Sequence, residues 1–280
     1  MRYIFFAIIA EIFIIYASVL VKITSVSPIM TGFYRTCLSL PIFFLFALKN
    51  KELFKLSPKD LSLMILSGLF FGSDLVFFNH AIHHTSVANV NLIGSLVCFI
   101  LVPIGIIFFH EKIKKQFIIG GIIALFGVFV LIKGEDQSSI AHPFGDFLAF
   151  LSMCSYAIFL SLVYKMRRKY HTMVFMFYSG IGASLLLLIV GSSLEGFSLP
   201  QDTKNWFFIL LIALFGQILG QGFFGFIMGK ISTQTSSLLL LLSPITAAIM
   251  GFFILGEKIG LFEILGIGII LFGVYLAKSK

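Results

Sequence analysis

This sequence of 280 residues has few charged residues, one tryptophan and three cysteines. Asp, Glu, Lys and Arg make up 11% of the chain, whereas soluble domains carry about 25% of these residues. A water-soluble fold is therefore excluded, and so is intrinsic disorder, which requires low hydrophobicity and high charge. The cysteines lie inside apolar runs without the spacing of a metal site. We expect no metal and no cofactor.

What the sequence has in abundance is apolar residues, which form 59% of the chain with a mean hydropathy of +1.07. A helix needs roughly 20 apolar residues to cross a bilayer. The first run contains Glu11 and no cleavage site follows it, so we interpret it as a retained helix and not as a signal peptide. The sequence predicts an all-α integral membrane protein with ten transmembrane helices at about 3–24, 29–49, 60–83, 86–109, 116–133, 145–165, 172–194, 205–229, 233–255 and 261–278.

The positive charges indicate how the chain is oriented. The net charge is +8, but the Lys and Arg residues lie in short clusters between apolar runs, so we expect no nucleic-acid partner. With a cytoplasmic N-terminus, 15 of them fall in cytoplasmic segments and 4 on the opposite side. This bias predicts a multi-pass protein of a bacterial inner (cytoplasmic) membrane with both termini in the cytoplasm.

Two short motifs occur twice along the chain. Glu-Lys-Ile begins at Glu111 and again at Glu257, and Leu-Phe-Gly-Val begins at Leu125 and again at Leu271. Both pairs are 146 residues apart, which indicates two five-helix halves, 1–134 and 143–280. Because five is odd, the second half enters the membrane from the opposite side. Such inverted repeats are common in secondary transporters, which bind their substrate near the midplane.

The arrangement resembles the EamA-type transporters of the drug/metabolite transporter superfamily. The second half carries Ser243-Pro244, Gly256-Glu257-Lys258 and Leu271-Phe272-Gly273-Val274. The family's proline, thirteen residues before the Glu, is Pro244 in the second half, but Cys98 stands at that place in the first half. The sequence therefore leaves open whether the fourth helix bends where the ninth does. The resemblance implies a transporter fold, and a structural or gating role for Glu111 and Glu257.

Three charged residues, Glu11, Arg35 and Asp74, lie well inside predicted spans. A charge near the bilayer centre costs roughly 2.5–3.5 kcal/mol, so each one should have a partner. Counting ~1.5 Å of rise per residue places Arg35 and Asp74 at the same depth. They either form an ion pair that locks two helices or flank a zwitterionic ligand. Glu11 either binds a neighbouring helix by a hydrogen bond or carries a coupled proton.

Neutral polar residues in the spans are further candidates for the site. Gln217 and Gln221 are four residues apart on one helix face, where they either hold a polar ligand or bond a neighbouring helix. Asn89 opens the fourth helix, where it orients a ligand or caps the helix. Phe78 follows Asp74 in the third helix and completes the candidate set.

Glycines in the fifth and tenth helices form close-packing faces, among them Gly120, Gly127, Gly266 and Gly273. Such a face serves either a homodimer or the packing of each helix within its own half. We expect the second use.

These features favour a secondary transporter of a small polar organic metabolite, such as an amino acid or a related compound, working by alternating access and driven by the substrate gradient or by protons. Its partners would be the metabolite and the lipid bilayer. Alternatives are an exchanger of nucleotides or nucleotide sugars, a lipid flippase and, less favoured, a membrane transferase. An exchanger would need more than the one deep cation, Arg35, to bind phosphate. An enzyme is not expected, because the only acidic loop pair, Glu135-Asp136, is predicted to be exposed.

Overall fold

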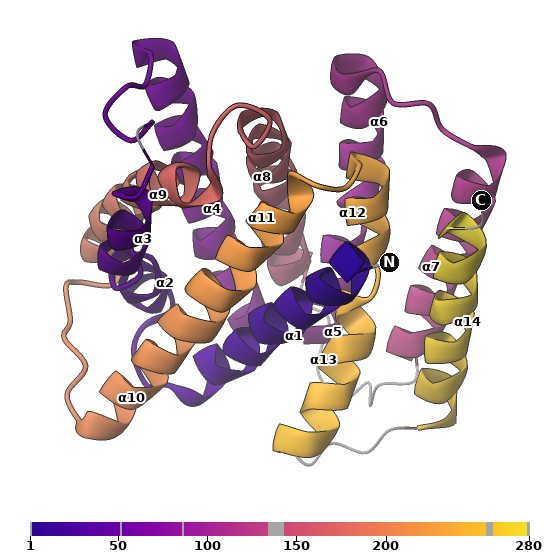
Figure 1. The fold of residues 1–280 in the computed structure, drawn as a ribbon. Helices are drawn as coiled ribbons and strands as arrows, with labels where there is room; N and C mark the ends of the chain where they lie inside the picture. Colours follow the sequence, from indigo (N-terminus) through magenta and orange to yellow (C-terminus); the bar gives the residue numbers. More distant parts are fainter. Residues whose placement is uncertain (1, 51, 86, 134–142, 256–259, 279–280) are drawn as a thin grey trace.

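The computed structural model describes residues 2–50, 52–85, 87–133, 143–255 and 260–278, and within these ranges the chain forms helices and no strands (Figure 1). The elements are α1 (Arg2–Ile23), α2 (Pro28–Cys37), α3 (Leu40–Ala47), α4 (Pro58–His84), α5 (Val87–Ser95), α6 (Cys98–Phe109), α7 (Lys115–Lys133), α8 (Pro143–Met166), α9 (Thr172–Leu194), α10 (Thr203–Leu211), the π-helix η1 (Ile212–Gly222), α11 (Phe223–Met228), α12 (Thr233–Leu240), α13 (Ser243–Met250), the π-helix η2 (Gly251–Leu255) and α14 (Leu261–Lys278).

Six helical stretches are long and apolar enough to cross a membrane, and the shorter apolar helices add four candidates. The six are Pro28–Ala47, Pro58–His84, Pro143–Met166, Thr203–Met228, Thr172–Leu194 and Thr233–Ile254. The shorter ones are Phe5–Val21, Leu92–Phe108, Lys115–Leu131 and Leu261–Ala277. The expectation of an all-helical protein with several helices able to span a membrane is confirmed for the described residues.

Several of the predicted helices are interrupted. The run at 86–109 divides into α5 and α6 at residues 96–97, and the run at 233–255 divides into α12 and α13 at residues 241–242. After a shift of 146 residues the two breaks fall within one residue of each other. Pro244 stands at the start of α13, where a missing N–H is tolerated, but α6 begins at Cys98 without a proline. The fourth helix is therefore interrupted at nearly the same place as the ninth.

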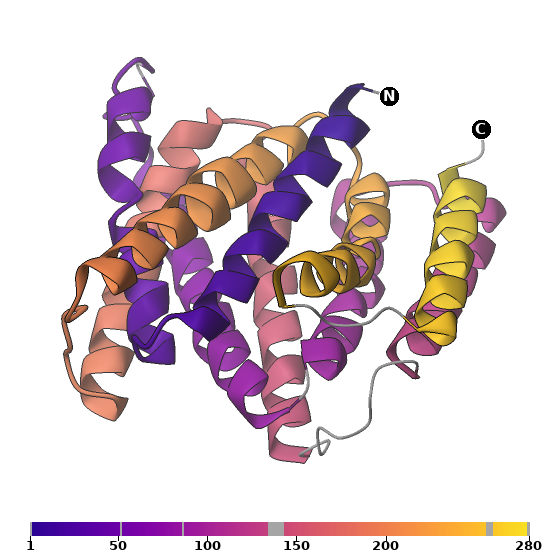
Figure 2. The same cartoon turned by 90° about the horizontal axis from the view of Figure 1, so that it is seen from below.

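The centre of the bundle is formed by α4, which packs on α8 and α9, while α1 packs along η1 and α11. Figures 1 and 2 show α1 lying beside the long α10–α11 segment in both views. Glycine permits the closest of these contacts, since a Cβ built on Gly68 of α4 would lie 1.9 Å from the carbonyl oxygen of Ser179 in α9. This tight packing fixes the helices that surround the interior.

Helices α7 and α14 pack on each other at one edge of the molecule (Figure 1). A Cβ on Gly273 would lie 2.6 Å from the carbonyl oxygen of Gly120, and a Cβ on Gly266 would lie 2.5 Å from the Cα of Leu131. The expectation that each small-residue face joins its helix to its own half is therefore wrong. The two faces join the last helix of one half to the last helix of the other.

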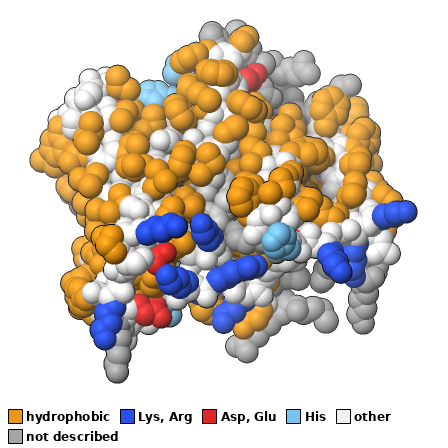
Figure 3. All heavy atoms as spheres, turned by 90° about the horizontal axis from the view of Figure 1, so that it is seen from above, with side chains coloured by type: hydrophobic (Ala, Val, Ile, Leu, Met, Phe, Trp, Pro, Cys, Tyr) orange, Lys and Arg blue, Asp and Glu red, His pale blue; other side chains and the backbone are white. Residues whose placement is uncertain are grey.

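Basic residues gather at one end of the bundle. The connections α3–α4, α6–α7, α8–α9 and α11–α12 lie at the upper end in Figure 1, and they expose Lys55, Lys112, Lys114, Arg168, Lys169 and Lys230. Seen from this side, Lys and Arg side chains form a band next to a large apolar surface (Figure 3). These segments are ones that the charge pattern assigns to the cytoplasm.

Candidate functional site

A cavity of about 110 Å³ lies between helices of both halves of the chain. An apolar cavity of about 150 Å³ holds a benzene molecule, so a cavity of this size admits only a small ligand. Apolar side chains, Phe78 among them, form much of its wall. The polar side chains of the wall are Glu11, Ser18, Arg35, Asp74, Ser95, Ser152, Tyr156, Gln221 and Ser243. A concave, largely apolar site with a few convergent polar groups is the usual form of a small-molecule site.

Arg35 of α2 is 6% exposed, and neutral groups of the π-helix η1 bind it. Its Nε donates to Oε1 of Gln217 at 3.2 Å and its Nη2 donates to the carbonyl oxygen of Gly216 at 3.1 Å. The guanidinium also lies over the ring of Phe71, 5.7 Å from the ring centroid. π-Helical segments are rare and are often found at functional sites. Here the segment supplies an acceptor on its backbone and one on a side chain.

Asp74 of α4 is 8% exposed and lines the same cavity as Arg35. The hydroxyl of Ser152 in α8 donates to its Oδ1 at 2.6 Å. Within the part of the chain that the structure describes, Asp74 and Arg35 form no salt bridge, so the predicted ion pair is not made in this conformation. The other predicted arrangement, in which the two residues flank a zwitterionic ligand, stays a prediction; both residues line the cavity.

Glu11 of α1 is 4% exposed and also faces the cavity. The hydroxyl of Ser243, the first residue of α13, donates to its Oε1. Its Oε2 is buried and has no hydrogen-bond partner among the described residues. An unpartnered carboxylate oxygen in a buried site is costly. A buried polar group without a hydrogen bond destabilises the fold by about 1–3 kcal/mol, and a charged group destabilises it by more. Glu11 thus holds a neighbouring helix with one oxygen and leaves the other available.

The two glutamines of η1, Gln217 and Gln221, make different contacts. Gln217 holds Arg35 from outside the cavity wall, whereas Gln221 lines the cavity and donates from Nε2 to the hydroxyl of Tyr156 at 3.1 Å. Tyr156 and Ser152 were not among the predicted site residues. They are four residues apart on α8, the spacing that drew attention to the glutamines, so the same criterion applied to α8 would have found them.

Asn89 is the one predicted site residue whose side chain lies outside the described residues. It belongs to α5, whose Val90, Gly94 and Ser95 contribute to the cavity wall. Among the described residues no group of three or more His, Cys, Asp or Glu side chains is arranged to hold a metal ion.

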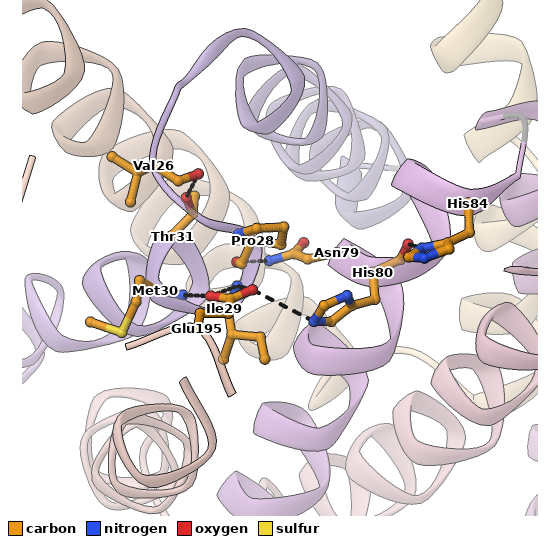
Figure 4. A network of polar contacts seen from close by, with 9 residues as sticks. All are labelled: Val26, Pro28, Ile29, Met30, Thr31, Asn79, His80, His84 and Glu195. Carbon is orange, nitrogen blue, oxygen red and sulfur yellow. Dashed lines mark hydrogen bonds and ion pairs between the residues drawn. The ribbon is translucent and has the colours of Figure 1, made fainter. Parts of the chain in front are cut away.

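A second polar network fixes the beginning of α2 (Figure 4). Glu195, directly after α9, accepts hydrogen bonds from the backbone N–H of Ile29 at 3.0 and 3.1 Å. The Nε2 atom of His80 lies 3.5 Å from the same carboxylate, and Asn79 donates to the carbonyl oxygen of Pro28 at 2.8 Å. A carboxylate at a helix N-terminus is stabilising, so this network secures the helix that carries Arg35.

A third network lies at the end of the bundle rich in Lys and Arg. Glu111, between α6 and α7, accepts hydrogen bonds from the backbone N–H and the hydroxyl of Thr233 at 3.1 and 2.5 Å, and from the hydroxyl of Tyr164 at 2.7 Å. Burial alone would raise the pKa of Glu111, but these hydrogen bonds outweigh burial and lower it. The carboxylate thereby ties the first half of the chain to the start of α12 in the second half.

Comparisons with known proteins agree with this architecture. A family model described as the EamA-like transporter family matches residues 1–133 and 143–278. An "Uncharacterized transporter" of Haemophilus influenzae is 23% identical, covering 78% of this chain and 74% of its own length. Another of that name, from Archaeoglobus fulgidus, is 24% identical with coverages of 91% and 90%.

Two further matches are a relative whose name states a function and a solved structure with a similar fold. A protein of Salmonella typhimurium named "Probable amino-acid metabolite efflux pump" is 24% identical over 66% of this chain and 65% of its own length. A crystal structure of a protein with 15% identity superposes with a TM-score of 0.79 and covers 99% of this chain and 95% of that one. At that identity the likeness concerns the fold alone.

Proposed function

Because this chain belongs to the EamA-like transporter family and is a transporter and not an enzyme, we propose that it is a secondary transporter of a small polar organic metabolite. An amino acid or a related compound is the substrate class that the site favours. The observation that carries the proposal is the cavity, which the buried side chains of Arg35 and Asp74 both line without a salt bridge between them. A zwitterion with a carboxylate and an amino group would satisfy both charges.

The size of the cavity and the name of one relative support the same substrate class. A cavity of about 110 Å³ suits a small metabolite, and the Salmonella typhimurium protein is named for amino-acid metabolites. A nucleotide or nucleotide sugar would need several cations for its phosphates, and among the described residues of the wall Arg35 is the only Lys or Arg. A lipid flippase remains the alternative that a transport assay must exclude.

We take the membrane topology to be ten helices in two inverted halves, 1–134 and 143–280. The six long and four shorter apolar helices, together with the matching breaks in the fourth and ninth helices, support this arrangement. The Lys and Arg residues at one end of the bundle favour cytoplasmic termini in a bacterial inner membrane. A homodimer would use a surface other than the small-residue faces, since α7 and α14 cover these within the chain.

In this proposal the two halves exchange conformations around the cavity. Glu111 closes one end by holding α12 through Thr233, and its counterpart Glu257 lies outside the described residues. Driving force comes from the substrate gradient or from protons carried by Asp74 or Glu11. No Walker A sequence occurs in the chain, so ATP is not the direct energy source.

A counterflow assay with purified protein in liposomes tests the substrate class. Vesicles loaded with unlabelled amino acids should accumulate the labelled amino acid transiently, and vesicles loaded with a nucleotide sugar should not. Arg35→Gln should abolish the exchange, because the carboxylate of the substrate loses its cation. Exchange of nucleotide sugars alone, or movement of labelled lipid between leaflets without amino-acid exchange, would overturn the proposal.

A further inference from the structure

The cavity contains one more acid than base among the described residues of its wall. Glu11 and Asp74 are the acids and Arg35 is the base, and all three are more than nine-tenths buried. A charge in the membrane interior requires a partner of opposite sign or a proton. A simple zwitterion balances Arg35 and one acid and leaves the other acid to a proton or to a second cation.

Arg35 forms no salt bridge with either acid among the described residues. Within the described part of the chain, its hydrogen bonds go to Gln217 and to the backbone of Gly216, and they use two of the five N–H groups of a guanidinium. Each acid receives one serine hydroxyl on one oxygen, while Oε2 of Glu11 is buried without a partner among the described residues. All three charges are therefore available to a ligand.

The two acids of the wall belong to different helices. Arg35 lies over Phe71, which is three residues before Asp74 on the same face of α4, so Arg35 and Asp74 form one end of the site. Glu11 belongs to α1 and is held by α13 through Ser243, whereas Asp74 belongs to α4 and is held by α8 through Ser152. A ligand that pairs each acid with its own cation needs two cationic groups.

Resting on the proposed function, we infer that the transported compound is a diamino monocarboxylate with a net charge of +1. Its carboxylate binds Arg35, its α-amino group binds Asp74, and its distal amino group binds the free oxygen of Glu11. Glu11 is then the residue that distinguishes a basic amino acid from a neutral one.

The test compares lysine with norleucine, which has the same carbon chain without the distal amino group. A ligand that binds the folded protein raises its melting temperature by mass action, so titration of the purified full-length protein in nanodiscs yields the two apparent Kd values. A charge-assisted hydrogen bond contributes about 1.5–3 kcal/mol, so lysine should bind about tenfold or more tightly than norleucine. In Glu11→Gln the ratio should fall to about one with norleucine binding unchanged.

Glu52→Gln, the same change at an exposed glutamate, is the matched control and should keep the lysine preference. Equal binding of lysine and norleucine by the wild type would overturn the inference, as would an unchanged preference in Glu11→Gln. If Glu11→Gln does not fold, the wild-type ratio alone decides. Binding and exchange of norleucine without a lysine preference would leave the proposed function intact, whereas exchange of neither class of amino acid would overturn the proposed function itself.

Discussion

The contact between Glu111 and Thr233 should stabilise the conformation described here, and Thr233→Val removes only its hydroxyl hydrogen bond. Thr233 is fully buried and its hydroxyl lies 2.5 Å from Oε2 of Glu111. A hydrogen bond to a charged group contributes about 1.5–3 kcal/mol, and valine has nearly the shape of threonine. With roughly 2–4 °C per kcal/mol for proteins approaching this size, the melting temperature at pH 7 should fall by several degrees.

The dependence on pH follows from the lowered pKa of Glu111. A carboxyl group whose pKa is lowered on folding stabilises the protein above its ordinary pKa of 4.5, and this contribution is lost as the pH falls through the lower folded value. The difference between wild type and Thr233→Val should therefore narrow below pH 4.5. Thr246→Val is the control, since that hydroxyl bonds only the carbonyl of Leu242 in its own segment. Equal losses from both variants at pH 7 would refute the reasoning.

Three further results are expected. Glu195→Gln should lower the melting temperature by a few degrees, because a helix cap contributes roughly 0.5–2 kcal/mol; an unchanged value would show that the cap on α2 is not needed. Gly273→Leu should reduce the yield of monodisperse protein, because a Cβ at this position would lie 2.4 Å from the backbone nitrogen of Ala124. Gly268→Leu should be tolerated, because a Cβ there would have no atom within 4 Å. Similar yields of the two variants would contradict the α7–α14 packing. An impermeant thiol reagent applied from outside should label Gln137→Cys and spare Lys55→Cys, and the reverse pattern would contradict the orientation.

The sequence predicted the helical class and the family because both depend on long-range patterns. Runs of apolar residues identify membrane helices regardless of how they pack, and the repeated Glu-Lys-Ile motif requires no structure to be seen. The same reasoning placed Arg35 and Asp74 at one depth, and both residues line the cavity. It could not decide between an ion pair and a shared space, because that depends on the rotation of each helix and on the acceptors that η1 provides.

The packing of α7 on α14 was missed for a related reason. A glycine face shows that another helix approaches closely, but it does not identify the helix. The break before Cys98 was equally hidden, since it occurs without the proline that marks the corresponding break at Pro244. Tyr156 and Ser152 could have been found from their spacing. The capping of α12 by Glu111 needed the structure, because 122 residues separate Glu111 from Thr233.

Uptake by proteoliposomes containing Asp74→Asn tests the central claim that this cavity is the transport site. The variant keeps the shape of the side chain and removes the charge that would bind the amino group of the substrate or carry a proton. We predict that the variant folds and loses amino-acid uptake or its pH dependence, whereas Asp202→Asn, at an exposed helix cap where asparagine serves equally well, retains both. Full uptake by Asp74→Asn with an unchanged pH dependence would contradict the account.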